Sequence, residues 1–366
     1  MTTGFVSHEK YMWHDTGHAG IFIPAVGHVQ PSEHAESPES KRRIRNLMEV
    51  SGLIRHLKLI DPRPATRDEV LRYHTPEYID RLAALSSERG GDAGVTTPFA
   101  AGGYDIALLS AGGVLAAAEA VVDGDVDNAY ALVRPPGHHA EADIGKGFCL
   151  LANAVLGIKH VKATRGVGRV AVVDIDVHHG NSAEHAFYED AEVLTISIHQ
   201  DNCFPPDSGA IGDTGRGAGK GYNINVPLPP GCGRDPYLAV MERVVTPALQ
   251  AYKPDLIVVP CGFDAGGFDP LGRMMLSSST YRAMAAKLKS LAGNLCGGRL
   301  LFTHEGGYAA VHVPFCAHAL IEELSDAPNP IDDPFDVILG SMGGHQIYPH
   351  QEAVIAKAET LARAVT

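Results

Sequence analysis

GRVAVVDIDVHHGN, at residues 168–181, joins a strand signal to a row of acids and histidines. Residues 168–173 are short, apolar and rich in β-branched valine, which predicts a strand buried on both faces. The residues from Asp174 to His179 then carry carboxylates and imidazoles. In open parallel sheets, ligands bind outside the carboxyl ends of the strands. This stretch therefore predicts a buried parallel strand that delivers polar side chains to a site.

The same pattern recurs along the chain. Further buried strands are expected at residues 128–134, 193–198, 256–259 and 299–302. Helical patterns fall at residues 183–188, 237–252 and 279–295, an alanine-rich buried helix is expected at 108–122, and a helix start is expected at 37–39. This alternation predicts an α/β fold with a mostly parallel sheet, in one domain covering residues 1–366.

Two other strand ends also carry chemistry. Residues 256–259 lead to Asp264, and residues 299–302 lead to Glu305-Gly306-Gly307-Tyr308. Because parallel strands end at one edge of a sheet, these groups should converge with those after residue 173. Asp and His are ligands that zinc accepts, and a catalytic zinc keeps three protein ligands. Asp264 is the best candidate to complete a site begun by the acids and histidines of residues 174–179.

Two short motifs suggest acid–base and oxyanion chemistry. RPPGHHA, residues 134–140, places His138 and His139 after a Pro-Pro-Gly turn, and a neutral imidazole near a metal-activated water is a natural general base. In EGGY, residues 305–308, the glycines allow a close backbone approach and Tyr308 offers a hydroxyl to a developing oxyanion. Each motif alone is weak evidence.

Composition narrows the class of protein. The 366 residues are 45% hydrophobic and carry a net charge of −13, which argues against a nucleic-acid partner and favours cationic partners such as acetyl-lysine tails or polyamines. The six cysteines form no CxxC pair and are expected to be reduced thiols. With no signal-peptide pattern and no window of 18 apolar residues, we expect a cytoplasmic protein without a membrane span.

Taken together, the motifs RPPGHHA, GFC (147–149), DIDVHHGN (174–181), GFDAGGFDPLG (262–272) and EGGY resemble the histone deacetylase and acetylpolyamine amidohydrolase superfamily. The resemblance runs from about Tyr11 to His345. It implies an arginase-like α/β fold with an eight-stranded, mainly parallel sheet and a narrow tunnel leading to zinc. It also implies hydrolysis of an acetylated amine, with an acetyl-lysine side chain favoured.

The resemblance assigns roles to named residues. Zinc would be bound by Asp176, His178 and Asp264. His139 would be the general base, His138 its electrostatic partner, Asp174 and Asn181 would orient these two histidines, and Tyr308 would donate to the oxyanion. Substrate would be bound by Gly147, Phe148, Phe204, Leu271 and Gly306. One potassium ion would use Asp174, Asp176, His178, Ser197 and Ile198, and a second would use Phe187, Asp190, Val193 and Tyr222.

Details at two positions indicate a subfamily. Asn181 stands where class I deacetylases carry aspartate, which resembles class II enzymes and their bacterial relatives. Position 308 is tyrosine, so the oxyanion donor is present and real activity is expected. Trp13 is expected to be buried in packing, and histidines such as His34 are expected on the surface.

Several alternatives stay open at this point. The substrate could be an acetylated polyamine, since it shares the acetyl-amine end with acetyl-lysine. A two-metal ureohydrolase would have a similar fold, and Asp264 with Asp269 superficially resembles its pattern, but the His-His pair and EGGY argue against it. A catalytically dead acyl-lysine reader is disfavoured by the intact Tyr308. A homo-oligomer is possible.

Overall fold

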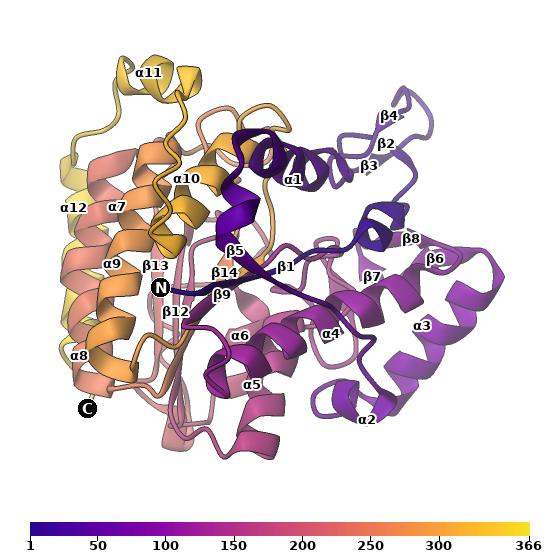
Figure 1. The fold of residues 1–366 in the computed structure, drawn as a ribbon, viewed down its shortest axis with the longest axis horizontal. Coiled ribbons are helices and arrows are strands. Elements are labelled where there is room, and N and C mark those ends of the chain that lie inside the picture. Colours follow the sequence, from indigo (N-terminus) through magenta and orange to yellow (C-terminus); the bar gives the residue numbers. More distant parts are fainter.

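Eight strands form one sheet in the computed structural model, which describes residues 1–366 (Figure 1). Their order is β13-β12-β11-β14-β15-β9-β1-β5, and every neighbouring pair is parallel. The strands are β1 (Thr3–Val6), β5 (Leu57–Ile60), β9 (Asn128–Ala131), β11 (Val170–Asp174), β12 (Val193–Gln200), β13 (Asn223–Leu228), β14 (Leu256–Cys261) and β15 (Leu300–His304). The expectation of a mainly parallel eight-stranded α/β sheet is confirmed.

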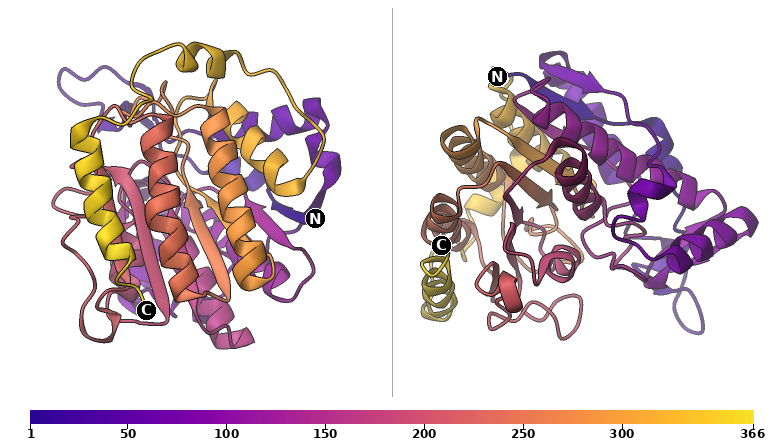
Figure 2. Two further views of the ribbon diagram at one scale, coloured as in Figure 1. Left: turned by 90° about the vertical axis from the view of Figure 1, so that its left-hand side faces the viewer. Right: turned by 90° about the horizontal axis from the view of Figure 1, so that it is seen from below.

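Helices cover both faces of this sheet, as the second views show (Figure 2). One face packs against α1 (Glu39–Ser51), α7 (Arg234–Val240), α8 (Thr246–Tyr252), α9 (Ser278–Cys296), α10 (Val313–Ser325) and α12 (Pro349–Ala362), with a π-helical turn at Met241–Val245 joining α7 to α8. The other face packs against α4 (Gly103–Val122), α5 (Asn153–Arg165) and α6 (Asn181–Phe187).

Smaller elements surround these layers. The short helices α2 (Arg67–Val70) and α3 (Pro76–Glu88) pack on the outer side of α4, and α11 (Pro334–Gly340) precedes α12. Short strands form β2 (His18–Gly20), β3 (Ile23–Pro24), β4 (Ser32–Glu33), β6 (Gly90–Asp92), β7 (Gly94–Val95), β8 (Pro98–Ala100) and β10 (Gly145–Lys146), and single 3-10 turns lie at Glu9–Trp13, Leu53–His56 and Gly217–Gly219.

Alternation along each strand explains the two packed faces. In β11, Val170 and Val172 join the core under α4 and α5, whereas Ala171 and Val173 join the core on the opposite face. Successive side chains of a strand point to opposite faces, so a strand covered on both sides must be apolar throughout. This is why the continuous valine run near residue 170 was informative about a central strand.

Most expected elements appear, with shifted ends. The alanine-rich helix begins at Gly103, five residues earlier than expected, and the helix expected at 237–252 is interrupted by the π-helical turn.

Trp13 was wrongly expected to be buried, because its side chain is 63% exposed and lies against the Lys10 ammonium. His34 was wrongly expected at the surface, because it is buried against Phe148. All six cysteines are free thiols.

Helix α4 bears on the expectation of no membrane span. By length and composition alone it is apolar enough to cross a membrane, which the count of consecutive apolar residues did not reveal. However, 61% of its apolar window is buried inside the protein, and the core helix of a soluble protein passes the same test. Ala117 and Ala118 pack in the core shared with the sheet and α5, whereas Ala107 and Ala111 pack in the core beside α3, as expected for a buried helix.

Gly112 in α4 gives a test of this packing. A Cβ there would lie 1.7 Å from the Arg63 carbonyl oxygen, in a segment that is tied to the helix by the Ala65 N–H donating to the Leu108 carbonyl at 2.8 Å. We predict that Gly112→Ala lowers the free energy of unfolding by about 1–3 kcal/mol despite the better helix propensity of alanine. Chemical denaturation measures the change.

Gly293 in α9 provides the matched control. It is also helical, but a Cβ there would meet nothing within 4 Å. Gly293→Ala should therefore raise the free energy of unfolding by about 0.4–1 kcal/mol. Equal effects at the two positions would contradict the close approach at α4.

Candidate active site and metal centre

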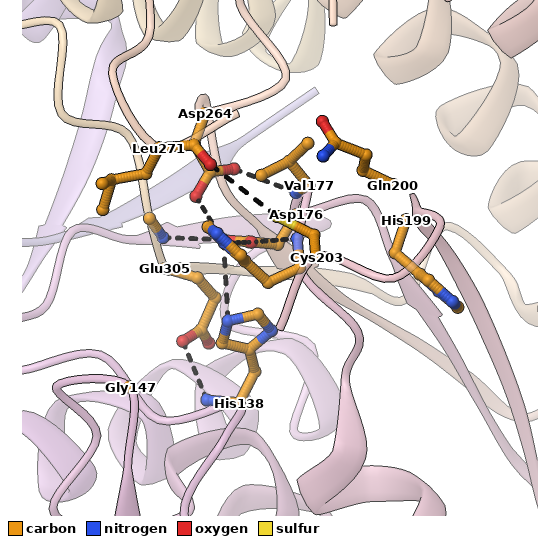
Figure 3. A network of polar contacts seen from close by, with 12 residues as sticks. His138, Gly147, Asp176, Val177, His199, Gln200, Cys203, Asp264, Leu271 and Glu305 are labelled. Carbon is orange, nitrogen blue, oxygen red and sulfur yellow. Dashed lines mark hydrogen bonds and ion pairs between the residues drawn. The ribbon is translucent and has the colours of Figure 1, made fainter. Parts of the chain in front are cut away.

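Four strands deliver polar side chains to one edge of the sheet. Asp174 ends β11, with Asp176 and His178 in the loop that follows, and Asp264 lies in the loop after β14. The loop after β9 carries His138 and His139, and the loop after β15 carries Glu305, Gly306 and Tyr308. Figure 3 shows Asp264, Asp176 and His138 gathered here, each from a different loop. The convergence expected from the strand ends is therefore present.

Asp176, His178 and Asp264 form a buried cluster with the shape of a metal site. One ligand atom from each lies within 4.8 Å of the others. His178 Nδ1 is 3.0 Å from Asp176 Oδ1 and 3.2 Å from Asp264 Oδ2. Three donors from a loop after β11 and a loop after β14 thus surround one point.

The charge of this cluster favours a bound cation. Asp176 and Asp264 are fully buried, and their only ion-pair partners are His138 and His178, with no lysine or arginine. Backbone N–H groups stabilise part of the charge, since Val177 donates to Asp264 Oδ1 at 2.9 Å and Gly306 donates to Asp176 Oδ2 at 2.9 Å. Asp264 Oδ2 has no hydrogen bond of acceptable geometry despite the nearby His178 ring. A buried carboxylate oxygen left in this way is a natural metal ligand.

The two adjacent histidines have different partners. His138 Nδ1 lies 3.0 Å from Asp174 Oδ2, whereas His139 Nδ1 lies 2.8 Å from the amide oxygen of Asn181. Burial lowers the pKa of His138, but the Asp176 and Asp174 charges outweigh it and raise that pKa to about 10. Burial and the neighbouring His138 hold the pKa of His139 well below its usual value. The carboxylate of Asp174 beside one ring and the amide oxygen of Asn181 beside the other therefore favour positive charge on His138 over His139.

A cavity of about 150 Å³ opens above these groups. Its wall is mostly apolar and contains no acidic side chain; the lining residues are Phe22, Thr96, His139, Gly147, Phe148, His178, Cys203, Phe204, Leu271 and Tyr308. The expected tunnel residues Gly147, Phe148, Phe204 and Leu271 all lie here. The ring of Phe204 is edge-on to His139 at 4.9 Å, and Phe148 is edge-on to Tyr308 at 5.8 Å.

Gly306 has a different place from the one expected. It does not line the cavity, but a Cβ on it would lie 2.0 Å from Asp264 Oδ2 and 2.8 Å from Asp176 Oδ2. Its lack of a side chain lets the backbone reach the two carboxylates and donate to Asp176. The structure therefore places Gly306 beside the carboxylates of Asp176 and Asp264, and its expected contact with substrate stays a prediction.

Tyr308 is fixed at the cavity wall through its backbone. Its N–H donates to Asp269 Oδ2 at 2.7 Å, and the N–H of Leu271 donates to Asp269 Oδ1 at 2.9 Å. Asp269 thus ties together two wall residues, a role the sequence did not suggest. Burial raises the pKa of the Tyr308 phenol well above its usual value, so the hydroxyl keeps its proton and can donate it in a hydrogen bond.

Three lining residues escaped sequence reasoning. Phe22 comes from the turn between β2 and β3, Thr96 from the turn between β7 and β8, and Cys203 from the loop after β12. None belongs to a periodic segment or a motif. Their only advance signal was the proximity of Cys203 to the end of an expected strand.

The residues expected to hold potassium lie on and around β12, and both potassium sites stay predictions. In the first group, Asp174 and Ser197 are paired in register between β11 and β12, and Ile198 follows Ser197. In the second group, the Phe187 carbonyl accepts the N–H of Asp190, and Val193 begins β12. The Tyr222 carbonyl lies beside that strand and accepts the N–H of Thr195 at 2.9 Å.

Comparisons with known proteins agree with this geometry. Residues 34–324 match the histone deacetylase domain family. A histone deacetylase-like amidohydrolase of Pseudomonas aeruginosa is 48% identical over 91% of this chain and 88% of its own length. Histone deacetylase 8 of Arabidopsis thaliana is 36% identical over 97% of this chain and 94% of its own length. A probable deacetylase of Archaeoglobus fulgidus is 35% identical over 84% of this chain and 82% of its own length. The crystal structure of the HDA15 HD domain superposes with a TM-score of 0.85 at 29% identity, covering 99% of this chain and 94% of that one.

The cluster predicts one divalent metal ion per chain. Asp264→Ala should abolish metal retention, because it deletes one of three ligands. Asp269→Asn should keep the metal, because Asp269 is not part of the cluster. Its carboxylate accepts backbone N–H groups from Tyr308, Ala309 and Leu271 instead. Elemental analysis after dialysis measures both. Two metal ions per wild-type chain would contradict this site and favour a two-metal enzyme. Full metal occupancy in Asp264→Ala would also contradict this site.

Proposed function

Since the chain belongs to the histone deacetylase family, we propose that it is a zinc-dependent deacetylase that hydrolyses the acetamide of acetyl-lysine side chains. The observation that carries this proposal is the joint placement of three features at the floor and wall of one cavity. They are the Asp176–His178–Asp264 cluster, a neutral His139 and a protonated Tyr308.

The cluster suits zinc by its donor atoms. One imidazole nitrogen and two carboxylate oxygens are ligands that zinc accepts, and three protein ligands leave a position free for water or substrate. The orphaned Asp264 Oδ2 and the absence of a lysine or arginine counter-charge call for a cation at this point. When bound, zinc would supply Lewis acidity, which activates water and polarises the acetyl carbonyl.

The chain's own residues account for the proton transfers. With Nδ1 bonded to Asn181, His139 has Nε2 free to take a proton from an attacking water and then give it to the leaving amine. His138, paired with Asp174, holds positive charge beside it. The Tyr308 hydroxyl donates to the oxygen that becomes negatively charged during attack. Phe148 and Phe204 flank the linear chain of the substrate and exclude water from the site.

The cavity wall favours acetyl-lysine over acetylpolyamines. A polyamine carries a further ammonium group that a carboxylate would stabilise, and no acidic residue lines this cavity. In an acetyl-lysine peptide the same position is occupied by neutral backbone. Leu271, held by Asp269, presents an apolar side chain there. Asn181 beside His139 fits the bacterial class II-like branch of the family.

Two potassium ions complete the proposal. The first would lie near Asp174 and Ser197, whose strands pair in register, and the second near the carbonyls of Phe187 and Tyr222. Oxygen atoms suit a hard monovalent cation, and the first ion would add positive charge behind the acids of the metal cluster. A cytoplasmic location is proposed on the free thiols alone.

Tyr308 gives a direct test of the oxyanion role. We predict that Tyr308→Phe lowers turnover by about a hundredfold to a thousandfold, because one donor to the oxyanion is lost. KM should change much less, since this hydrogen bond strengthens mainly in the transition state. Steady-state kinetics and zinc content are measured together. Near-normal turnover with zinc in place would make Tyr308 a packing residue.

Substrate choice is tested by direct comparison. The wild-type protein should hydrolyse acetyl-lysine peptides with a higher kcat/KM than acetylated spermidine or putrescine. Leu271→Glu should shift this preference toward the polyamines, because it adds a carboxylate at the rim. Leu271→Gln is the matched uncharged control and should not shift it. A wild-type preference for acetylpolyamines would place the chain in the other branch of the superfamily.

A further inference from the structure

Behind His139, hydrogen bonds lead away from the substrate cavity to a second, polar cavity. Asn181, which bonds His139 Nδ1 through Oδ1, donates from Nδ2 to Glu141 Oε1 at 2.8 Å. Glu141 lines a cavity of about 580 Å³ whose wall is mostly polar or charged. The general base is thus linked through one amide to a carboxylate that lies outside the substrate tunnel.

Glu141 is an anion held by Lys146 and His185. Lys146 Nζ lies 2.6 Å from its Oε1, and His185 Nδ1 lies 3.0 Å away. Burial raises the pKa of the Glu141 carboxyl, but the hydrogen bonds from His185 and Lys146 outweigh it and lower that pKa to about 2. Glu141 therefore only accepts hydrogen bonds at neutral pH.

The backbone around Glu141 fixes its position. Its own N–H donates to the Ile144 carbonyl at 2.9 Å, which closes a short turn. The Ala142 carbonyl accepts the N–H of Thr75 at 2.9 Å, which ties this turn to the start of α3. The carboxylate is therefore preorganised before Asn181 bonds to it.

This geometry selects one tautomer of His139. Because a carboxylate cannot donate, the Asn181 amide must turn its nitrogen to Glu141 and its oxygen to His139 Nδ1. Nδ1 then carries the proton, and Nε2 keeps the lone pair that a general base needs. The Asn181 nitrogen also donates to the carbonyl of His139 itself at 3.0 Å, so Glu141 and this carbonyl together orient the amide.

We propose that Glu141 is a positioning residue that fixes the orientation of the Asn181 amide and thereby holds His139 in its base-competent tautomer. The proposal rests on the proposed role of His139 as general base. It makes positions 141 and 181 a matched pair. An amide at 181 requires an acceptor at 141, whereas a carboxylate at 181 requires a donor.

A mutant cycle tests this matching. Glu141→Ala should lower kcat about 10-fold with KM within about twofold, the effect of losing an outer hydrogen-bond partner, and Glu141→Gln should lower it less because its amide oxygen can still accept. Asn181→Asp should lower it by about 100-fold, because two carboxylates would face each other. The double variant should recover at least about 10-fold over Asn181→Asp, since the new amide at position 141 can donate to the new carboxylate. A double variant no better than Asn181→Asp would overturn the proposal.

A second readout does not depend on turnover. Nitrogen-15 NMR of the labelled imidazoles in the zinc-loaded protein should report protonated Nδ1 for His139 in the wild type and a mixture of tautomers in Glu141→Ala. An unchanged tautomer in Glu141→Ala would refute the positioning role. If the wild type hydrolyses neither substrate class, the deacetylase proposal fails, while this spectrum still judges the role of Glu141.

The control is a glutamate near the same cavity but without a link to His139. Glu189 pairs with Arg216, a lining residue, and is largely exposed. Glu189→Gln should leave kcat and the His139 spectrum unchanged, and thermal unfolding of every variant checks that the fold is intact. A loss in Glu189→Gln equal to that in Glu141→Gln would mean that any charge change at this cavity acts alike, which would overturn the specific link.

Discussion

Buried negative charge at one edge of the sheet is the constraint around which this molecule is arranged. Asp174, Asp176, Asp264 and Glu305 are all nearly or completely inaccessible to solvent. An unpaired buried ion costs several kcal/mol even after the protein relaxes. Part of this buried charge is stabilised by backbone N–H groups and by two imidazoles. The N–H groups belong to Val177, Gly306, Gly137 and His138, and the imidazoles to His138 and His178. The proposed metal cation would meet the rest, so the fold and the proposed reaction would share one electrostatic requirement.

A second buried ionic group supports the loop that carries the two histidines. The Arg134 guanidinium, four residues before His138, is fully buried and bonds Glu36 and the carbonyls of Tyr11 and His14. Lys41 also pairs with Glu36, and its ammonium lies 5.5 Å from the centre of the Tyr308 ring. The N-terminal segment is thereby tied to the floor of the site, although it supplies no residue of the metal cluster.

Local sequence was sufficient for the parts of the site that sit directly at strand ends. Asp176 and Asp264 follow short, β-branched, apolar segments that favour buried strands, and parallel strands end at one edge of a sheet. The walls were a different matter. Phe22 reaches the cavity from a turn more than 100 residues before His139, and such approaches depend on loop conformations that have no periodic signature. The prediction that Trp13 is buried was wrong for a different reason. The presence of one large apolar side chain does not reveal whether other residues cover it.

The neighbouring histidines show why residue type alone does not predict which of two adjacent rings carries charge. His138 and His139 are chemically identical and their rings lie 3.9 Å apart, so both cannot carry a proton charge at little cost. Asp174 opposite one ring and Asn181 opposite the other settle which is charged, because an anion stabilises an imidazolium and a neutral amide oxygen does so far less. The side-chain amide of Asn181, however, has an NH2 end that donates hydrogen bonds and an oxygen end that accepts them. It can orient the His139 ring only if another group fixes which end faces the ring. The difference between the two histidines therefore depends on the groups that contact Asp174 and Asn181. These groups lie outside the sequence motifs and are brought together by the packing of separate loops.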